Sequence, residues 1–267
     1  MEATAARRAA EILLAEHMAN TTFKAFDQQH GPAAIPDAYD IQDQYVALLR
    51  AEHGDAIGYK VGLTSETMQK FCGIGHPIAG VVLANRLHRS GATIRRADFG
   101  RLGLEFEIAV RIKSDVPPSA TPLSVEAIAP YIAGVCAAIE LVDDRAADYT
   151  SLDMLALVSD NSWNGGIVLS EFATTWPDLE SVLGRATKDG AAIGEGHGRD
   201  ILGHPFNSVA WLAAQLASRG VGLKAGQVVM TGSVMKTVFP AEDANYRFDL
   251  APIGFVEVQL AEGKSAS

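Results

Sequence analysis

The spacing of apolar residues divides the chain into a helical N-terminal part and a longer part rich in strands. Residues 6–19 and 38–50 carry apolar side chains at the spacing of amphipathic helices. From about residue 56, short alternating or continuous apolar runs indicate strands. We predict strands at 57–63, 81–83, 104–112, 136–142, 165–169, 227–231, 246–250 and 253–260, and further helices at 65–71, 124–133, 151–158 and 207–219.

This order of elements lacks the regular alternation of strand and helix that a doubly wound sheet requires. We therefore predict an α+β fold, a mixed β-sheet roll or sandwich with an N-terminal helical cap. The helical region is expected at 1–55 and the sheet-rich domain at 56–267.

Polar residues at element ends give more local predictions. Asp37 and Asn207 are placed to cap the second and the last helix, and Thr64 or Ser65 to cap the helix at 65–71. The glycine-rich segment 194–200 predicts a loop, at most a flexible lid, because its glycines lack the dinucleotide-binding spacing. We expect His204 to have a structural role.

Two glutamates interrupt the apolar run from Leu104 to Val110. As a strand, this run points Glu105 and Glu107 to one face and its large apolar residues to the other. Alternate residues of a strand lie roughly 7 Å apart, so two flexible carboxylates can converge on one cation. A solvent-facing polar edge of a half-buried sheet would produce the same pattern.

A third acid lies in a similar setting, which favours a metal site. Glu140 is embedded in the apolar segment 136–142. Ligation by carboxylate oxygens suits hard cations such as Mg²⁺ or Mn²⁺. Zinc is disfavoured, because the seven histidines show no ligand spacing and Cys72 and Cys136 are isolated.

Composition narrows the class of protein. The net charge of -10 and the pI near 5.1 argue against a nucleic-acid or anionic-membrane surface. Residues 1–26 contain acids between short apolar pieces, so no signal-peptide core is expected, and no stretch reaches transmembrane length. We expect a cytoplasmic enzyme whose substrate is a small molecule.

Three further segments carry candidate chemistry. Lys60 lies in a predicted strand and is either an exposed lysine or a cation that steers a substrate carboxylate or moves protons. Asp160 and Asn161 belong to a polar cluster that is either a hydrogen-bonded turn or a site that orders water or substrate. Thr231 ends a strand where a hydroxyl and backbone N–H groups could receive an anion.

Together these segments resemble the 2-keto-4-pentenoate hydratase and 4-oxalocrotonate decarboxylase group of the fumarylacetoacetate hydrolase superfamily. The matching segments are Lys60-Val61-Gly62-Leu63-Thr64, Glu105-x-Glu107, Glu140-Leu141-Val142-Asp143-x-Arg145, Ser159-Asp160-Asn161, Leu202-Gly203-His204-Pro205-x-Asn207 with Ala210-Trp211-Leu212-Ala213, and Thr231-Gly232.

The resemblance implies a Mg²⁺ or Mn²⁺ site at Glu105, Glu107 and Glu140, an active-site lysine at Lys60, and a homo-oligomer. With it we expect catalysis by Lys60 and Asp160, and substrate contacts from Asn161, Thr231 and Leu63. The implied substrate is a 2-keto acid. The implied reaction is hydration of 2-hydroxy-2,4-dienoates in the meta-cleavage catabolism of aromatic compounds.

The segment His76-Pro77-Ile78-Ala79-Gly80 departs from the pattern. Many hydratases of this group resemble Pro-Asp-Phe/Tyr-Gly there, and Ile78 cannot carry a proton as their aspartate can. His76 could substitute. A 4-oxalocrotonate-type (2-oxo-3-hexenedioate) decarboxylase is therefore the main alternative, followed by an acylpyruvate hydrolase and by a non-catalytic metal-binding partner subunit.

Overall fold

The computed structural model describes residues 1–27 and 29–262. Its helices are α1 (Ala3–Met18), α2 (Ile35–His53), α3 (Glu66–Phe71), α4 (Val125–Ile128), α5 (Met154–Ser159) and α6 (Pro205–Ser218). Its strands are β1 (Ala56–Gly62), β2 (Ile78–Leu83), β3 (Leu87–Arg89), β4 (Ala92–Arg95), β5 (Leu102–Ile112), β6 (Ile132–Asp143), β7 (Asn164–Leu169), β8 (Leu183–Lys188), β9 (Ala191–His197), β10 (Val228–Ser233), β11 (Ala244–Leu250) and β12 (Gly254–Ala261).

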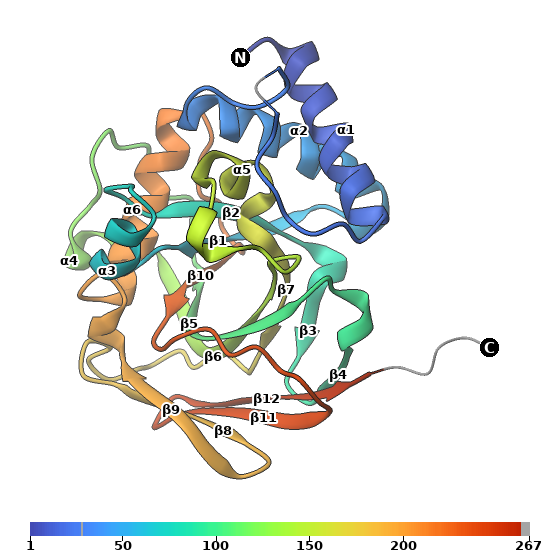
Figure 1. The fold of residues 1–267 in the computed structure, drawn as a ribbon. Coiled ribbons are helices and arrows are strands. Elements are labelled where there is room, and N and C mark those ends of the chain that lie inside the picture. The colour runs from blue at the N-terminus through green and yellow to red at the C-terminus, as the bar shows by residue number, and fades with distance from the viewer. Residues whose placement is uncertain (28, 263–267) are drawn as a thin grey trace.

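These strands form two mixed sheets. The larger has seven strands in the order β2-β1-β10-β5-β6-β7-β3, and the smaller has five in the order β4-β12-β11-β8-β9. Parallel and antiparallel pairs occur in both, for instance β1 parallel to β10 and β10 antiparallel to β5. Figure 1 shows the smaller sheet below the larger sheet, and the helices α1 and α2 above the larger sheet. The predicted α+β fold with mixed sheets is confirmed.

The two faces of the larger sheet bury different residues because side chains alternate along each strand. On β5, Leu104, Phe106 and Ile108 belong to the main hydrophobic core, which also contains residues of the smaller sheet and of α6. Ala109, which shares the face of Glu105 and Glu107, belongs to a separate small cluster with residues of β2, β6, β7 and β10. The candidate site therefore lies on the face away from the main core.

The segment Asn161–Trp163 fastens the start of β7 to β2, an edge strand of the same sheet. The side-chain amide of Asn161 donates to the Val81 carbonyl at 2.8 Å, and the Val81 N–H donates to Asn161 Oδ1 at 2.7 Å. Asn161, Ser162 and Trp163 all have positive φ angles, of 48°, 50° and 61°. Such a backbone persists only where surrounding contacts hold it, and here the bonds to β2 do so.

The N-terminal helices pack on each other and on the sheet. Ala6, Ala9, Ala10 and Leu13 of α1 form a buried cluster with residues of α2. Gln42 of α2 then donates to the carbonyls of β2 and α5, at 2.9 and 2.7 Å. Neither these helices nor any other described helix is long and apolar enough to cross a membrane. The division into domains at residues 55 and 56 stays a prediction.

Some local predictions were wrong. Residues 194–197 belong to β9 rather than to a loop, because they pair with β8. Asn207 lies inside α6, whose N-cap is His204, and there Nδ1 accepts a hydrogen bond from the Phe206 N–H at 3.0 Å. Asp37 likewise lies inside α2, whose N-cap is Ala34. The cap predicted at Ser65 and the structural role predicted for His204 are confirmed.

Candidate metal centre

Three glutamates meet on one face of the larger sheet. Glu105 and Glu107 lie two residues apart on β5, and the antiparallel register places Glu140 of β6 directly opposite Glu105. One carboxylate oxygen of each residue lies within 4.8 Å of the others. The structure thus brings together the three residues that the sequence predicted as metal ligands.

Burial makes this cluster electrostatically costly without a cation. Glu107 and Glu140 are completely buried, while Glu105 is partly exposed. Burial, followed by the nearby charges of Glu140 and Glu105, raises the pKa of Glu107 well above its usual range. Burial also raises the pKa of Glu140, although Lys60 opposes this shift.

Lys60 is buried beside the cluster rather than exposed. It lies on β1, opposite Gly80 of β2 on one side and Met230 of β10 on the other. Its Nζ is 3.4 Å from Glu140 Oε1, and the residue is only 5 % exposed. Burial lowers the pKa of Lys60, but the charges of the three glutamates outweigh it and leave the pKa raised. The lysine therefore carries its proton next to the carboxylates.

Each glutamate has one oxygen held by a neutral donor. The Thr237 hydroxyl donates to Glu105 Oε1 at 2.6 Å, the Gly232 N–H to Glu107 Oε2 at 2.8 Å, and the Asn164 amide to Glu140 Oε1 at 2.9 Å. The second oxygens of Glu107 and Glu140 are buried and have no hydrogen-bond partner among the described residues. These two oxygens are buried without donors, and the three acids outnumber the one lysine beside them. Both features fit a site for a hard divalent cation.

Ile78 lies beside Lys60. A Cβ atom at Gly62 would be 3.3 Å from Lys60 Nζ and 3.4 Å from Ile78 Cγ1, so both side chains border the space above that glycine. Ile78 is 2 % exposed. The neighbouring His76 donates through Nδ1 to the Pro77 carbonyl at 2.7 Å. The site therefore has an apolar wall beside its lysine.

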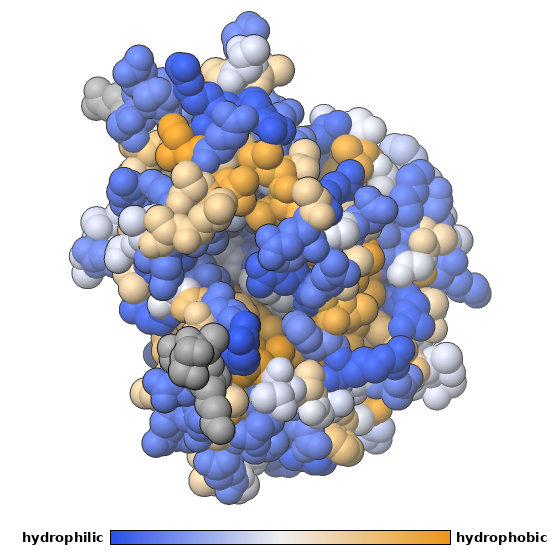
Figure 2. Space-filling view, turned by 90° about the vertical axis from the view of Figure 1, so that its right-hand side faces the viewer, coloured by the Kyte–Doolittle hydropathy of each residue, from blue (hydrophilic) through white to orange (hydrophobic). Residues whose placement is uncertain are grey.

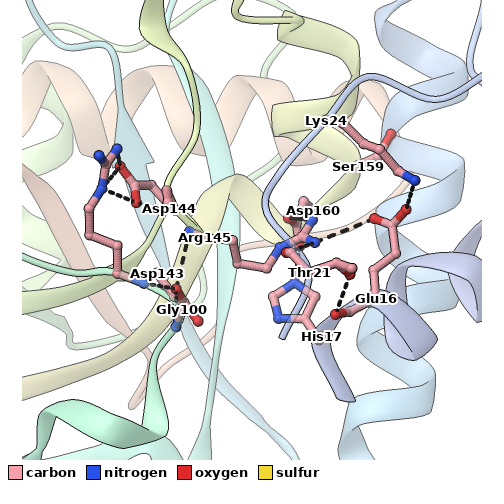
Figure 3. Close-up of polar contacts among 12 residues, drawn as sticks. Glu16, His17, Thr21, Lys24, Gly100, Asp143, Asp144, Arg145, Ser159 and Asp160 are labelled. Carbon is pink, nitrogen blue, oxygen red and sulfur yellow. Dashed lines mark hydrogen bonds and ion pairs between the residues drawn. The ribbon is translucent and has the colours of Figure 1, made fainter. Parts of the chain in front are cut away.

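Asp160 belongs to a different cluster of charges, drawn in Figure 3. His17 Nε2 donates to its Oδ1 at 2.6 Å, and Arg145 Nη2 donates to its Oδ2 at 2.7 Å. Arg145 also reaches Glu16 of α1 at 3.4 Å and the Thr21 carbonyl at 3.1 Å. Asp160 thus links α1, through His17, to the loop after β6, through Arg145. The catalytic role expected for Asp160 stays a prediction.

The remaining predicted residues are engaged mainly with the backbone. Asn161 uses both ends of its amide on Val81, as described above. The hydroxyl of Thr231, completely buried, donates to the Ile108 carbonyl at 2.6 Å. Leu63 has a positive φ of 55°, and its carbonyl accepts a hydrogen bond from Gln69. Their roles in substrate binding stay predictions.

A cavity of about 320 Å³ lies between the N-terminal helices and the segment that begins β7. Its lining includes His17, Arg86, Trp163 and Asn164, but of the described residues that line it none is a member of the glutamate triad. Figure 2 shows this side of the molecule, which is hollowed between its upper and lower parts. Asn164 therefore borders the cavity while its amide reaches Glu140.

The sequence placed backbone N–H groups that could receive an anion beside Thr231, but it did not connect Gly232, Thr237 or Asn164 with the glutamates. Thr237 and Gly232 follow β5 by more than a hundred residues, and no local pattern connects them with it. Asn164 lies in the polar segment 158–166, which predicted either a hydrogen-bonded turn or a site that orders water or substrate, with Asp160 and Asn161 rather than Asn164 as its candidate residues. A buried acid in a strand needs a donor, but sequence alone does not say which residue supplies it.

Comparisons with known proteins identify the family of the chain. The family model for the fumarylacetoacetate (FAA) hydrolase C-terminal region matches residues 52–261. A 2-keto-4-pentenoate hydratase of Paraburkholderia phymatum is 30% identical, over 84% of this chain and 86% of its own length. A 4-oxalocrotonate decarboxylase of Pseudomonas putida is 29% identical, over 93% and 96%.

The fold is also that of a solved structure. The 4-oxalocrotonate decarboxylase of Pseudomonas putida G7, complexed with magnesium and adipate, superposes with a TM-score of 0.91 at 24% identity, and covers 98% of this chain and 99% of that chain. At this identity the likeness shows the fold alone. Because the family model spans most of the sequence and both relatives align over nearly their full length, the chain belongs to the fumarylacetoacetate hydrolase family.

Proposed function

We propose that the protein is a metal-dependent lyase that adds water to 2-hydroxy-2,4-dienoates. The observation that carries this proposal is the buried trio of Glu105, Glu107 and Glu140 with Lys60 beside it. Its relatives are named hydratases and decarboxylases, and both classes are lyases. The family resemblance and the all-oxygen ligand set support Mg²⁺ or Mn²⁺ as the cofactor.

The glutamates would hold the divalent ion through the oxygens that no protein donor occupies. When bound, the ion supplies positive charge that stabilises negative charge developing on a 2-keto acid. Lys60 Nζ, held 3.4 Å from Glu140, is placed to bind a substrate carboxylate or to move a proton. Its burial and its pairing with Glu140 hold the ammonium beside the glutamates, where a substrate bound to the ion would lie.

A decarboxylase is the second candidate, and Ile78 is the observation that favours it. Hydration needs groups that protonate the diene and activate water, whereas loss of carbon dioxide needs only an electron sink and a site that accepts the product. An apolar side chain beside Lys60 supplies no such group. Two relatives named 4-oxalocrotonate decarboxylase, at 29% and 26% identity, support the same reading.

The two reactions are separated by giving the Mg²⁺-loaded protein each substrate in turn. Hydration is followed by loss of the ultraviolet band of 2-hydroxypenta-2,4-dienoate, and decarboxylation by carbon dioxide released from 2-oxo-3-hexenedioate. We expect the first to be turned over. Turnover of only the second would establish the decarboxylase, and silence on both with metal bound would contradict a lyase.

We also propose a homo-oligomer, as the family resemblance implies. Light scattering on the purified protein tests this directly. A mass equal to that of one chain, 28.3 kDa, would contradict it.

A further inference from the structure

Among the donors around the glutamates, Asn164 has an unusual position. Its amide donates to Glu140 Oε1 at 2.9 Å, and Lys60 Nζ approaches the same oxygen at 3.4 Å. Glu140 Oε2 is buried without a partner among the described residues. One oxygen of the carboxylate is thus shared by two donors while the other is left free.

We propose that Asn164 and Thr237 are positioning residues, which turn Glu140 and Glu105 so that each presents one free oxygen to the cation. This inference rests on the metal centre of the proposed function. Neither residue touches the substrate or the ion. Each acts through the carboxylate that it holds, as donors behind metal ligands commonly do.

Loss of the Asn164 amide should weaken metal binding more than loss of the Thr237 hydroxyl, because Lys60 lies beside Glu140. A buried ammonium and a buried carboxylate attract each other strongly where water is excluded. The Asn164 amide occupies part of Oε1 and holds the plane of the carboxylate, in which Oε1 is the oxygen near the lysine and Oε2 has no partner among the described residues. Without that amide, Glu140 is free to rotate and to pair with Lys60 through both oxygens, which removes a ligand from the cation.

Thr237 has the same task in a more exposed place. Its hydroxyl donates to Glu105 Oε1 at 2.6 Å, and Glu105 is partly exposed whereas Glu140 is buried. Water can replace a lost donor there, so the effect of removing the hydroxyl is smaller. The third carboxylate, of Glu107, is held by the Gly232 N–H, which no side-chain substitution removes.

A side chain cannot be introduced at Gly232, the donor to Glu107, without moving the backbone. Gly232 has a φ of 112°, and a Cβ atom there would lie 2.3 Å from the Thr64 hydroxyl oxygen. A side chain at this position would displace the backbone that holds Glu107. Asn164 and Thr237 are therefore the two positions where the orientation of the glutamates is open to test by substitution.

The test uses Asn164→Leu, which keeps the approximate size of the side chain and removes the donor, and Thr237→Val. Asn85→Leu is the matched control, because the Asn85 amide donates to the Glu52 carbonyl at 3.0 Å rather than to a ligand. Affinity for Mn²⁺ is measured from the paramagnetic resonance signal of the free ion. The visible spectrum of bound Co²⁺ reports the ligand geometry.

We expect Asn164→Leu to weaken Mn²⁺ binding about 10- to 100-fold and to change the Co²⁺ spectrum. Thr237→Val should weaken it by about 2- to 10-fold, and Asn85→Leu should leave it unchanged. Folded Asn164→Leu and Thr237→Val proteins with wild-type affinity and spectrum would overturn the inference. If Asn164→Leu does not fold, Thr237→Val decides it. Failure of the wild-type protein to bind Mn²⁺ would instead refute the metal centre itself.

Discussion

Two buried clusters of charge in this molecule differ in how their charges are balanced. Around Asp160, the side chains of His17 and Arg145 occupy both oxygens of a single carboxylate. Around Glu107, three carboxylates face one lysine, and two buried oxygens have no donor among the described residues. At Asp160 the carboxylate has a donor at each oxygen, whereas in the glutamate cluster the acids outnumber the cations.

This difference separates a structural ion pair from a site that receives a ligand. Burying charge is costly unless every charge is paired and hydrogen-bonded. At Asp160, residues of the chain itself meet that condition for both carboxylate oxygens, and they join α1 to the loops that follow β6 and α5. The glutamate cluster does not meet it, and its three converging carboxylates could hold a divalent cation. The following predictions test this contrast.

The largest effect is expected for Lys60→Ala. Removing a group that binds substrate or moves a proton should lower kcat about 10²- to 10⁴-fold. Affinity for Mn²⁺ should be kept, because the three carboxylates remain. Steady-state kinetics and metal titration check this, with Lys70→Ala on the surface of α3 as the control. Unchanged turnover would remove Lys60 from the mechanism.

In the paired cluster, Asp160→Ala should act on stability instead. It leaves Arg145 buried without its partner, so the free energy of unfolding should fall by about 3–5 kcal/mol. Asp98→Ala, which removes an exposed pair with Arg95, should cost at most about 1 kcal/mol. Urea unfolding measures both. If Asp160→Ala kept its stability but lost turnover, Asp160 would be catalytic, as the sequence suggested.

Glu107→Gln, in contrast to Asp160→Ala, should affect metal binding rather than stability. Removing a ligand should weaken Mn²⁺ binding at least about 100-fold. The metal-free protein should be about as stable as the wild type, because the raised pKa of Glu107 keeps a proton on that carboxyl, and a glutamine amide is neutral too and can still accept from the Gly232 N–H. Calorimetric titration and urea unfolding check the two parts. A large loss of stability without metal would show that the cluster is balanced already.

The last prediction concerns pH. Because the folded-state pKa of Glu107 is raised above its ordinary value of 4.5, the folded protein holds a proton that the unfolded chain releases. Stability of the metal-free protein should therefore fall as the pH rises from about 4.5 through the raised pKa, by about 1.4 kcal/mol for each unit of the shift. Saturating Mn²⁺ should remove this fall. A metal-free profile that is flat above pH 4.5 would contradict the assignment.

The sequence predicted the metal ligands better than their surroundings. Alternation along one strand places Glu105 and Glu107 on the same face, and this needs only local information. That Glu140 lies directly opposite Glu105 depends on the register between β5 and β6. A shift by one residue would turn Glu140 to the other face. No pairing between these two strands was predicted from the sequence, so this contact was not predicted.

Residues whose environment is made by distant segments were predicted less well. From its segment alone, Lys60 was expected to be exposed. It is buried because β1 pairs with β10, which lies far along the chain. The partner of Asp160 in α1 is separated from it by 143 residues. The hairpin of β8 and β9 escaped prediction because its glycines and charged residues lack apolar alternation. Long-range pairing, rather than local propensity, decides each of these cases.

The central claim, that the three glutamates share one divalent cation, is tested most directly by the anomalous scattering of a crystal soaked in Mn²⁺. The account predicts one strong peak per chain, bounded by Glu105, Glu107 and Glu140 and absent from crystals of Glu107→Gln. No peak at that place in the wild-type protein, with the three carboxylates turned away from one another, would contradict it.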